Sequence, residues 1–166
     1  MKGDKRPRTD DALPDPSVPL QPLPDELCEH VGFMLGKARQ ELAARLDPLV
    51  ADLGLTIRHF GILLLLIRRG ALRQTEVAGL IRLDRTTVMN MVDELEHAGF
   101  VVREPDPRDR RANAVTATPR GRKWLEKIRP AAEKIENDFL SPLSSAEQET
   151  LRVLLTRLVA PAKAGR

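Results

Sequence analysis

Residues 100–117 contain two short apolar segments separated by a strongly charged stretch. The first segment, Phe100-Val-Val-Arg103, and the second, Ala112 to Ala117, carry the aromatic and β-branched residues that are typical of strands. We therefore predict a hairpin, and its tip carries Arg108, Asp109, Arg110 and Arg111. A charged tip of this kind adds little to a core, which indicates that it serves an external partner.

Two short helices are predicted immediately before this hairpin. Apolar residues at helical spacing indicate a helix over residues 74–81 and a second one that begins after Asp84, a favoured N-cap, and ends at Gly99. The outward face of the second helix is expected to carry Arg85, Thr86, Met89, Asn90 and Asp93. Two short helices with a tight turn, followed by a charged hairpin, predict a winged helix-turn-helix. In that fold the second helix enters the DNA major groove, and hairpin arginines suit the negative potential of a narrow minor groove.

The rest of the chain is predicted to be helical, except at its N-terminus. Residues 1–24 combine many prolines with basic residues and predict a disordered extension. Residues 25–54 repeat apolar side chains every three or four positions, which predicts one first helix. Residues 118–162 predict two further amphipathic helices, and Pro130 is expected to kink or divide the first of them.

These segments give an expected fold class that is mainly α with a small β-hairpin wing (α+β). The winged helix-turn-helix lobe is predicted to span residues 55–117. Its most apolar helix, between Thr56 and Gly70, is apolar almost all round and is therefore expected at the centre of the core.

Positive charge is concentrated in the same lobe. The net charge of the chain is +3, yet the stretch from Arg103 to Lys123 alone has seven Lys/Arg against three Asp/Glu. The stretch from Arg58 to Arg85 has six Lys/Arg against two Asp/Glu. A basic centre between more acidic flanks indicates a polyanion as partner, and a solvated basic face is the alternative that charge alone leaves open.

Other functional classes find little support in the sequence. We find no nucleophile–base pairing, glycine-rich phosphate loop or metal-ligand triad, and so predict no enzyme, no catalytic residue, no cofactor and no metal site. The longest apolar run, residues 61–67, is too short to span a membrane, and no apolar segment typical of a secretory signal follows the charged N-terminus. The single cysteine, Cys28, excludes an intramolecular disulfide. These features predict a cytoplasmic protein without a membrane partner.

The middle of the chain resembles the multiple-antibiotic-resistance regulator (MarR) family over residues 75–121, which read TEVAGLIRLDRTTVMNMVDELEHAGFVVREPDPRDRRANAVTATPRG. The shared features are a Ser/Thr-rich recognition helix, Leu-Glu, a glycine with a hydrophobic pair, the Asp-x-Arg wing and the Thr-x-x-Gly that opens the next helix. The likeness extends from about Asp25 to Leu158. It implies a homodimeric repressor whose first and last helices form a dimerisation region, and whose lobes bind double-stranded, pseudo-palindromic operator DNA until a small aromatic or phenolic effector releases it.

The resemblance also implies roles for particular residues. Those implied in the major groove are Arg85, Thr86, Thr87, Met89 and Asn90. At the wing, Asp109 is expected to brace Arg111, which enters the minor groove. Arg108 and Arg110 are expected to contact phosphates or the groove rim. Arg73 stands where the family usually has a Thr or Ser cap, and it adds a charge near the phosphates.

An effector cleft is implied as well, and its candidate lining residues are Phe33, Lys37, Arg39, His59, Phe60 and Trp124. Cys28 lies near the place of a peroxide-sensing cysteine in one branch of the family. Gly32 holds that place here and the chain has no tyrosine, so a structural thiol is favoured over a sensor. The alternative to an operator-binding regulator is a winged-helix protein-interaction module that does not bind DNA.

Overall fold

The structure is a computed structural model that describes residues 22–106 and 109–160, with the side chain of Arg110 left out. Almost all of the predicted N-terminal extension, and Arg108 at the hairpin tip, lie outside the described residues. Within the described ranges, the helices fall short of the length and apolarity that a membrane span requires.

The N-terminal helical segment is divided into four pieces, whereas the sequence predicted one helix over residues 25–54. These pieces are α1 (Asp25–Cys28), α2 (Val31–Leu46) and two 3₁₀ turns, η2 (Asp47–Leu49) and η3 (Ala51–Leu53). The chain is extended at His30 between α1 and α2, where the flanking Leu27 and Val31 are exposed and no burial holds the two turns in line. At the other end Pro48 lacks the amide hydrogen that a continuing α-helix requires.

Three helices form the centre of the lobe: α3 (Ile57–Arg69), α4 (Gln74–Ile81) and α5 (Arg85–His97). The predicted central helix is confirmed, because Ile62, Leu63 and Leu66 of α3 are fully buried. Gly70 ends α3 with a φ of 82°, a conformation that glycine adopts without strain. The apolar residues of α5 opposite its predicted outward face are buried, namely Val88, Met91, Val92 and Leu95.

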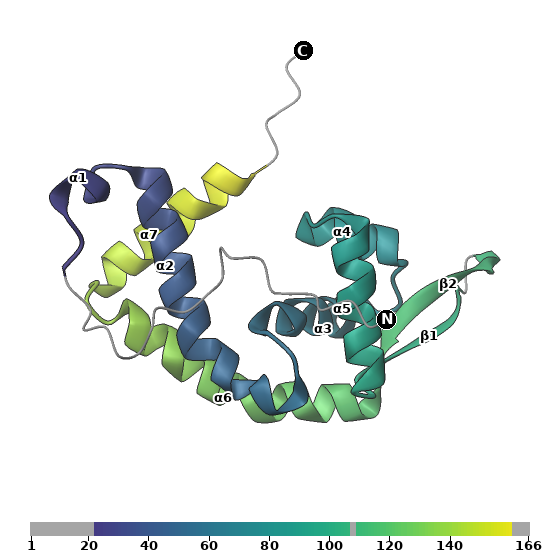
Figure 1. The fold of residues 1–166 in the computed structure, drawn as a ribbon. Coiled ribbons are helices and arrows are strands. Elements are labelled where there is room, and N and C mark those ends of the chain that lie inside the picture. Colours follow the sequence, from purple (N-terminus) through teal and green to yellow (C-terminus); the bar gives the residue numbers. More distant parts are fainter. Residues whose placement is uncertain (1–21, 107–108, 161–166) are drawn as a thin grey trace, which may run out of the picture.

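The hairpin consists of β1 (Val101–Asp106) and β2 (Asp109–Ala117), which pair antiparallel. Both strands extend further toward the tip than the apolar segments predicted, because the ladder continues through Pro105 opposite Asn113 before the register shifts. Leu72, between α3 and α4, forms a bridge to Val115 and fixes the base of the hairpin to the lobe. Figure 1 shows the hairpin projecting away from the helices.

Two helices close the chain, α6 (Pro119–Leu140) and α7 (Ser145–Val159). Of the two outcomes expected at Pro130, a kink or a division, the division is wrong, since α6 is continuous through that residue. Pro130 is exposed, so water can replace the lost backbone hydrogen bond. In Figure 1, α6 runs from the hairpin side of the molecule to the side formed by α1, α2 and α7.

Candidate nucleic-acid interface

The N-terminus of α5 is fixed by Asp84, as its sequence position predicted. One carboxylate oxygen accepts from the Thr87 backbone N–H at 2.9 Å, and the other accepts from the Thr87 hydroxyl at 2.6 Å. These hydrogen bonds lower the pKa of Asp84 from its ordinary value of 3.8. The Thr87 hydroxyl was expected to contact DNA, but its hydrogen bond is donated to Asp84 at the helix cap.

The first two turns of α5 present a short outward face. Arg85, Thr86 and Met89 are exposed, and Asn90 is half-buried. Met89 retains 46% of its surface, although its neighbours Val88 and Met91 are buried in the core. Helical periodicity therefore identified the two faces of this helix, and the outward one is free to approach a partner.

Arg73 connects the start of α4 to the hairpin. Its Nε donates to the Asp106 carboxylate at 2.5 Å, and one of its terminal nitrogens lies 3.4 Å from the carboxylate of Asp109. Its backbone N–H donates to Glu76 at 2.7 Å. Arg73, expected near the phosphates, is thus held against the wing by two carboxylates.

Asp106 is the residue that sequence reasoning missed. It is fully buried at the end of β1, where it pairs with Arg73. In the sequence it stands between two prolines in a charged stretch, and nothing local separates a buried carboxylate from a solvated one. The signal that could have found it is the arginine at position 73, a charged residue where the family usually has a Thr or Ser cap.

The wing tip is described in part. Asp109 accepts a hydrogen bond from the backbone N–H of Arg111 at 3.1 Å, so the expected bracing of Arg111 runs through the main chain. The side chain of Arg111 is exposed. Arg108, and the side chain of Arg110, lie outside the described part of the chain.

A second ionic link joins the C-terminal half of α5 to the hairpin. The Arg103 guanidinium on β1 pairs with Glu96 and with Asp93, both on α5. The Arg103 backbone N–H also donates to Glu96 at 3.1 Å. Because Arg73 and Arg103 tie the hairpin to α4 and α5 respectively, the outward face of α5 and the wing form one unit.

The residues expected to line an effector cleft do not all meet in one cavity. A cavity of about 450 Å³ is lined by three of them, Phe33, Lys37 and Arg39. Arg39 also lines a second cavity of about 230 Å³, between α2 and the first turn of α3. His59, Phe60 and Trp124 line neither.

Two of these remaining residues have other partners. His59 is buried and lies 2.8 Å from Glu94 of α5. Trp124 on α6 stacks on Phe100, with their ring centroids 4.6 Å apart, and this stack fixes α6 to the base of the hairpin. Trp124 is thus a packing residue within the lobe.

Metal and thiol chemistry gain no support from the part of the chain that the structure describes. Its histidines, cysteine and carboxylates form no group of three that could hold a metal ion. Cys28 is exposed, with its Sγ 4.0 Å from the backbone oxygen of Leu23.

Comparison with known proteins relates most of the chain to transcriptional regulators. The MarR family model matches residues 55–112. The HTH-type transcriptional repressor NicR of Pseudomonas putida is 30% identical over 143 residues, which cover 86% of this chain and 90% of NicR. The putative transcriptional regulatory protein for the hcr operon of Thauera aromatica is 35% identical over 105 residues, and the match spans 63% of each protein.

Solved structures agree with this relationship. BpsR of Bordetella bronchiseptica, whose DNA binding is regulated by 6-hydroxynicotinic acid, is 31% identical with a TM-score of 0.74, over 81% of this chain and 96% of BpsR. The transcriptional repressor CouR, bound to a 23-mer DNA duplex, is 29% identical with a TM-score of 0.71, over 81% of this chain and 96% of CouR. The match to NicR along most of both sequences, with the family model over the lobe, assigns the chain to the MarR family of winged helix-turn-helix transcriptional regulators.

Proposed function

We propose that this regulator is a repressor that binds double-stranded operator DNA through α5 and the β1–β2 hairpin together. The observation that carries the proposal is the rigid attachment of the hairpin to the helices, through Arg73–Asp106 and Arg103–Glu96. A helix and a hairpin held in a fixed relation can occupy a major groove and the neighbouring minor groove at once. The repressor NicR and the DNA-bound CouR support this reading.

Within this proposal the residues that contact DNA are those of the outward face of α5 and the wing. The exposed Arg85, Thr86 and Met89, with Asn90, are in position to meet base edges. Arg111, with Arg108 and Arg110, supplies the wing contacts. Arg73 and Thr87 act from behind this surface, because their side chains are engaged with Asp106 and Asp84.

We also propose that two copies of the chain associate through α1, α2 and α7. These helices expose large apolar side chains, namely Leu27, Val31, Phe33, Met34, Leu35, Val153, Leu154, Leu158 and Val159. Val31 and Leu158 each retain 69% of their surface. Apolar patches of this extent are uncommon on monomers, and a two-fold dimer would match a pseudo-palindromic operator.

The proposed effector is a small aromatic acid that binds between α2 and α3. Arg39 lines both cavities, Lys37 lines the larger and Arg58 lines the smaller, so cationic side chains border both spaces. Regulation of BpsR by 6-hydroxynicotinic acid supports this class of ligand. Release of DNA requires that the ligand bind one lobe spacing better than another. An operator-binding regulator of this kind acts in the cytoplasm.

The proposal is tested by selecting duplexes that the full chain retains from a random pool. We expect a two-fold, pseudo-palindromic sequence to be enriched, with half-sites about one helical turn apart. The same duplex should then shift in a gel with a 2:1 ratio of chain to duplex. A pool from which no duplex is retained would favour a protein-interaction module instead, and equal retention of all sequences would contradict recognition of an operator.

A further inference from the structure

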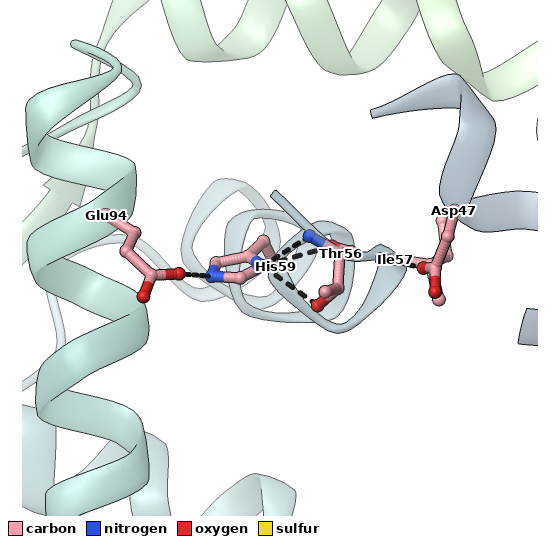
Figure 2. Close-up of polar contacts among 5 residues, drawn as sticks. All are labelled: Asp47, Thr56, Ile57, His59 and Glu94. Carbon is pink, nitrogen blue, oxygen red and sulfur yellow. Dashed lines mark hydrogen bonds and ion pairs between the residues drawn. The ribbon is translucent and has the colours of Figure 1, made fainter. Parts of the chain in front are cut away.

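His59 connects the first turn of α3 to α5. Its Nε2 lies 2.8 Å from the Glu94 carboxylate, and its Nδ1 lies 3.0 Å from the backbone nitrogen of Thr56, the N-cap of α3 (Figure 2). The Thr56 backbone N–H donates to Nδ1, and Nε2 is the nitrogen that faces Glu94. The ring therefore contacts the α3 cap through one nitrogen and α5 through the other.

The same turn of α3 forms one wall of the 230 Å³ cavity. Thr56, Ile57 and Arg58 line this cavity, as does Asp47 at the end of α2. The Ile57 backbone N–H donates to the Asp47 carboxylate at 2.8 Å. Figure 2 shows the resulting sequence of contacts, from Asp47 through Ile57 and Thr56 to His59 and Glu94.

We infer that His59 is a positioning residue that couples the wall of this cavity to α5. A ligand that shifts the first turn of α3 also shifts the His59 ring, since the ring is bonded to the cap of that turn. The Nε2–Glu94 hydrogen bond carries the shift to the helix that meets the major groove. The inference rests on the proposed function in identifying α5 as the helix that contacts DNA.

The chemistry of the pair supports this role over simple packing. His59 is only 3% exposed, and a buried imidazole requires a hydrogen-bond partner for each nitrogen. An aliphatic side chain of similar size would fill the same space without any such requirement. The Glu94 side chain is 52% exposed, so it fills no core space and its carboxylate can be removed without opening a cavity. The hydrogen bond between them is thus separable from the core by mutation.

The coupling is tested by hydrogen exchange, followed by mass spectrometry of the full chain. Asp47→Ala frees the Ile57 N–H at the cavity wall, and we expect it to speed exchange in α5 several-fold as well as in α3. Glu94→Ala is expected to speed exchange in α5 by roughly tenfold, the effect of one charge-assisted hydrogen bond. In the Glu94→Ala background, Asp47→Ala should then have no further effect on α5.

Two further variants distinguish a specific link from general loosening. Glu94→Gln keeps an acceptor for the His59 Nε2–H and should restore the response of α5 to Asp47→Ala. Asp93→Ala removes the neighbouring carboxylate, which pairs with Arg103 and not with His59, and should leave that response intact. If Asp47→Ala does not fold, Asp47→Asn, which keeps an acceptor oxygen, gives a smaller response with the same dependence on Glu94.

The inference is overturned if Asp47→Ala leaves the exchange rate of α5 unchanged. It is also overturned if Asp47→Ala speeds exchange in α5 equally with and without Glu94. Duplex binding is measured separately on the unmodified chain. If the chain binds no duplex but Asp47→Ala speeds exchange in α5 only when Glu94 is present, the proposed function is contradicted and the coupling stands. If the chain binds its duplex but exchange in α5 shows no Glu94-dependent response, the proposed function stands and the coupling is contradicted.

Discussion

Arg73 at the start of α4 and Asp106 at the end of β1 form an ion pair across the base of the wing, with 2.5 Å between Nε and the carboxylate. Asp106 has no exposed surface, while the Arg73 side chain is about one-third exposed. A buried carboxylate needs a partner charge, so the hairpin is held in the orientation in which this pair forms. The relationship explains how a two-stranded ribbon, which is weak by itself, keeps a fixed direction.

Removal of Arg73 is therefore expected to destabilise the fold. We predict that Arg73→Ala lowers the free energy of unfolding by about 2 kcal/mol, because the Asp106 carboxylate loses a charge-assisted hydrogen bond while it stays buried. Urea unfolding measures this, with Arg122→Ala, an exposed arginine on α6, as control. A change below roughly 0.5 kcal/mol, within the range of ordinary surface substitutions, would show that the pair does not hold the wing.

Gly121 lies where α6 passes closest to the base of the hairpin. A Cβ at this position would lie 2.3 Å from the backbone oxygen of Phe100, so Gly121→Ala is predicted to destabilise the chain by about 1–3 kcal/mol. Gly79→Ala is the matched control, since a Cβ there meets nothing within 4 Å and alanine favours the helix by up to roughly 1 kcal/mol. In thermal unfolding, the melting temperature should fall for Gly121→Ala and rise for Gly79→Ala. Equal melting temperatures would contradict the close approach of Gly121 to Phe100.

Asp84 gives the stability of the chain a defined pH dependence. The pKa of its carboxyl is held below the ordinary value of 3.8 by the hydrogen bonds from Thr87. The stabilisation is therefore complete above pH 3.8, and is lost as the pH falls through the lowered pKa of the folded state. Asp84→Asn keeps a capping oxygen that does not titrate. The free energy of unfolding of this variant should therefore decline less over the acidic range than that of the unmodified chain. Parallel unfolding curves against pH for the two proteins would contradict the assignment.

The apolar faces of α1, α2 and α7 predict the oligomeric state. Leu158→Glu places a charge at a side chain that is 69% exposed in the single chain, and should convert a dimer into a monomer at micromolar concentration. Val102→Glu, a similar change at an exposed apolar residue of β1 in the projecting hairpin, should leave the dimer intact. Sedimentation velocity reads the outcome directly. An unmodified chain that sediments as a monomer would remove the basis for two-fold operator recognition.

Local signals in the sequence predicted much of this structure. Asp84 and Thr118 each cap the helix that their neighbours predict, because a cap depends on hydrogen bonds within three residues. The outward and inward faces of α5 followed from helical periodicity alone. The hairpin was located by two β-branched segments, although its strands extend beyond them.

The features that were missed depend on contacts distant in sequence. Asp106 is buried because Arg73, 33 residues earlier, meets it across the lobe. His59 was expected at an effector cleft, and its ring instead bonds to Glu94, 35 residues later. The break at His30 and the continuity of α6 through Pro130 depend on exposure, which periodicity does not report. Propensity is local, whereas these outcomes are decided by tertiary packing.

The joint approach of α5 and the wing to a duplex is tested most directly by the salt dependence of binding in Arg111→Ala. On the selected duplex we expect this variant to bind about tenfold more weakly, with a log–log salt slope less steep by roughly 0.9, because one cation is lost from the DNA interface. Lys127→Ala, which removes an exposed cation on α6, should match the unmodified chain in affinity and slope. If Arg111→Ala keeps both the affinity and the slope of the unmodified chain, Arg111 does not contact DNA and the joint approach of α5 and the wing is contradicted.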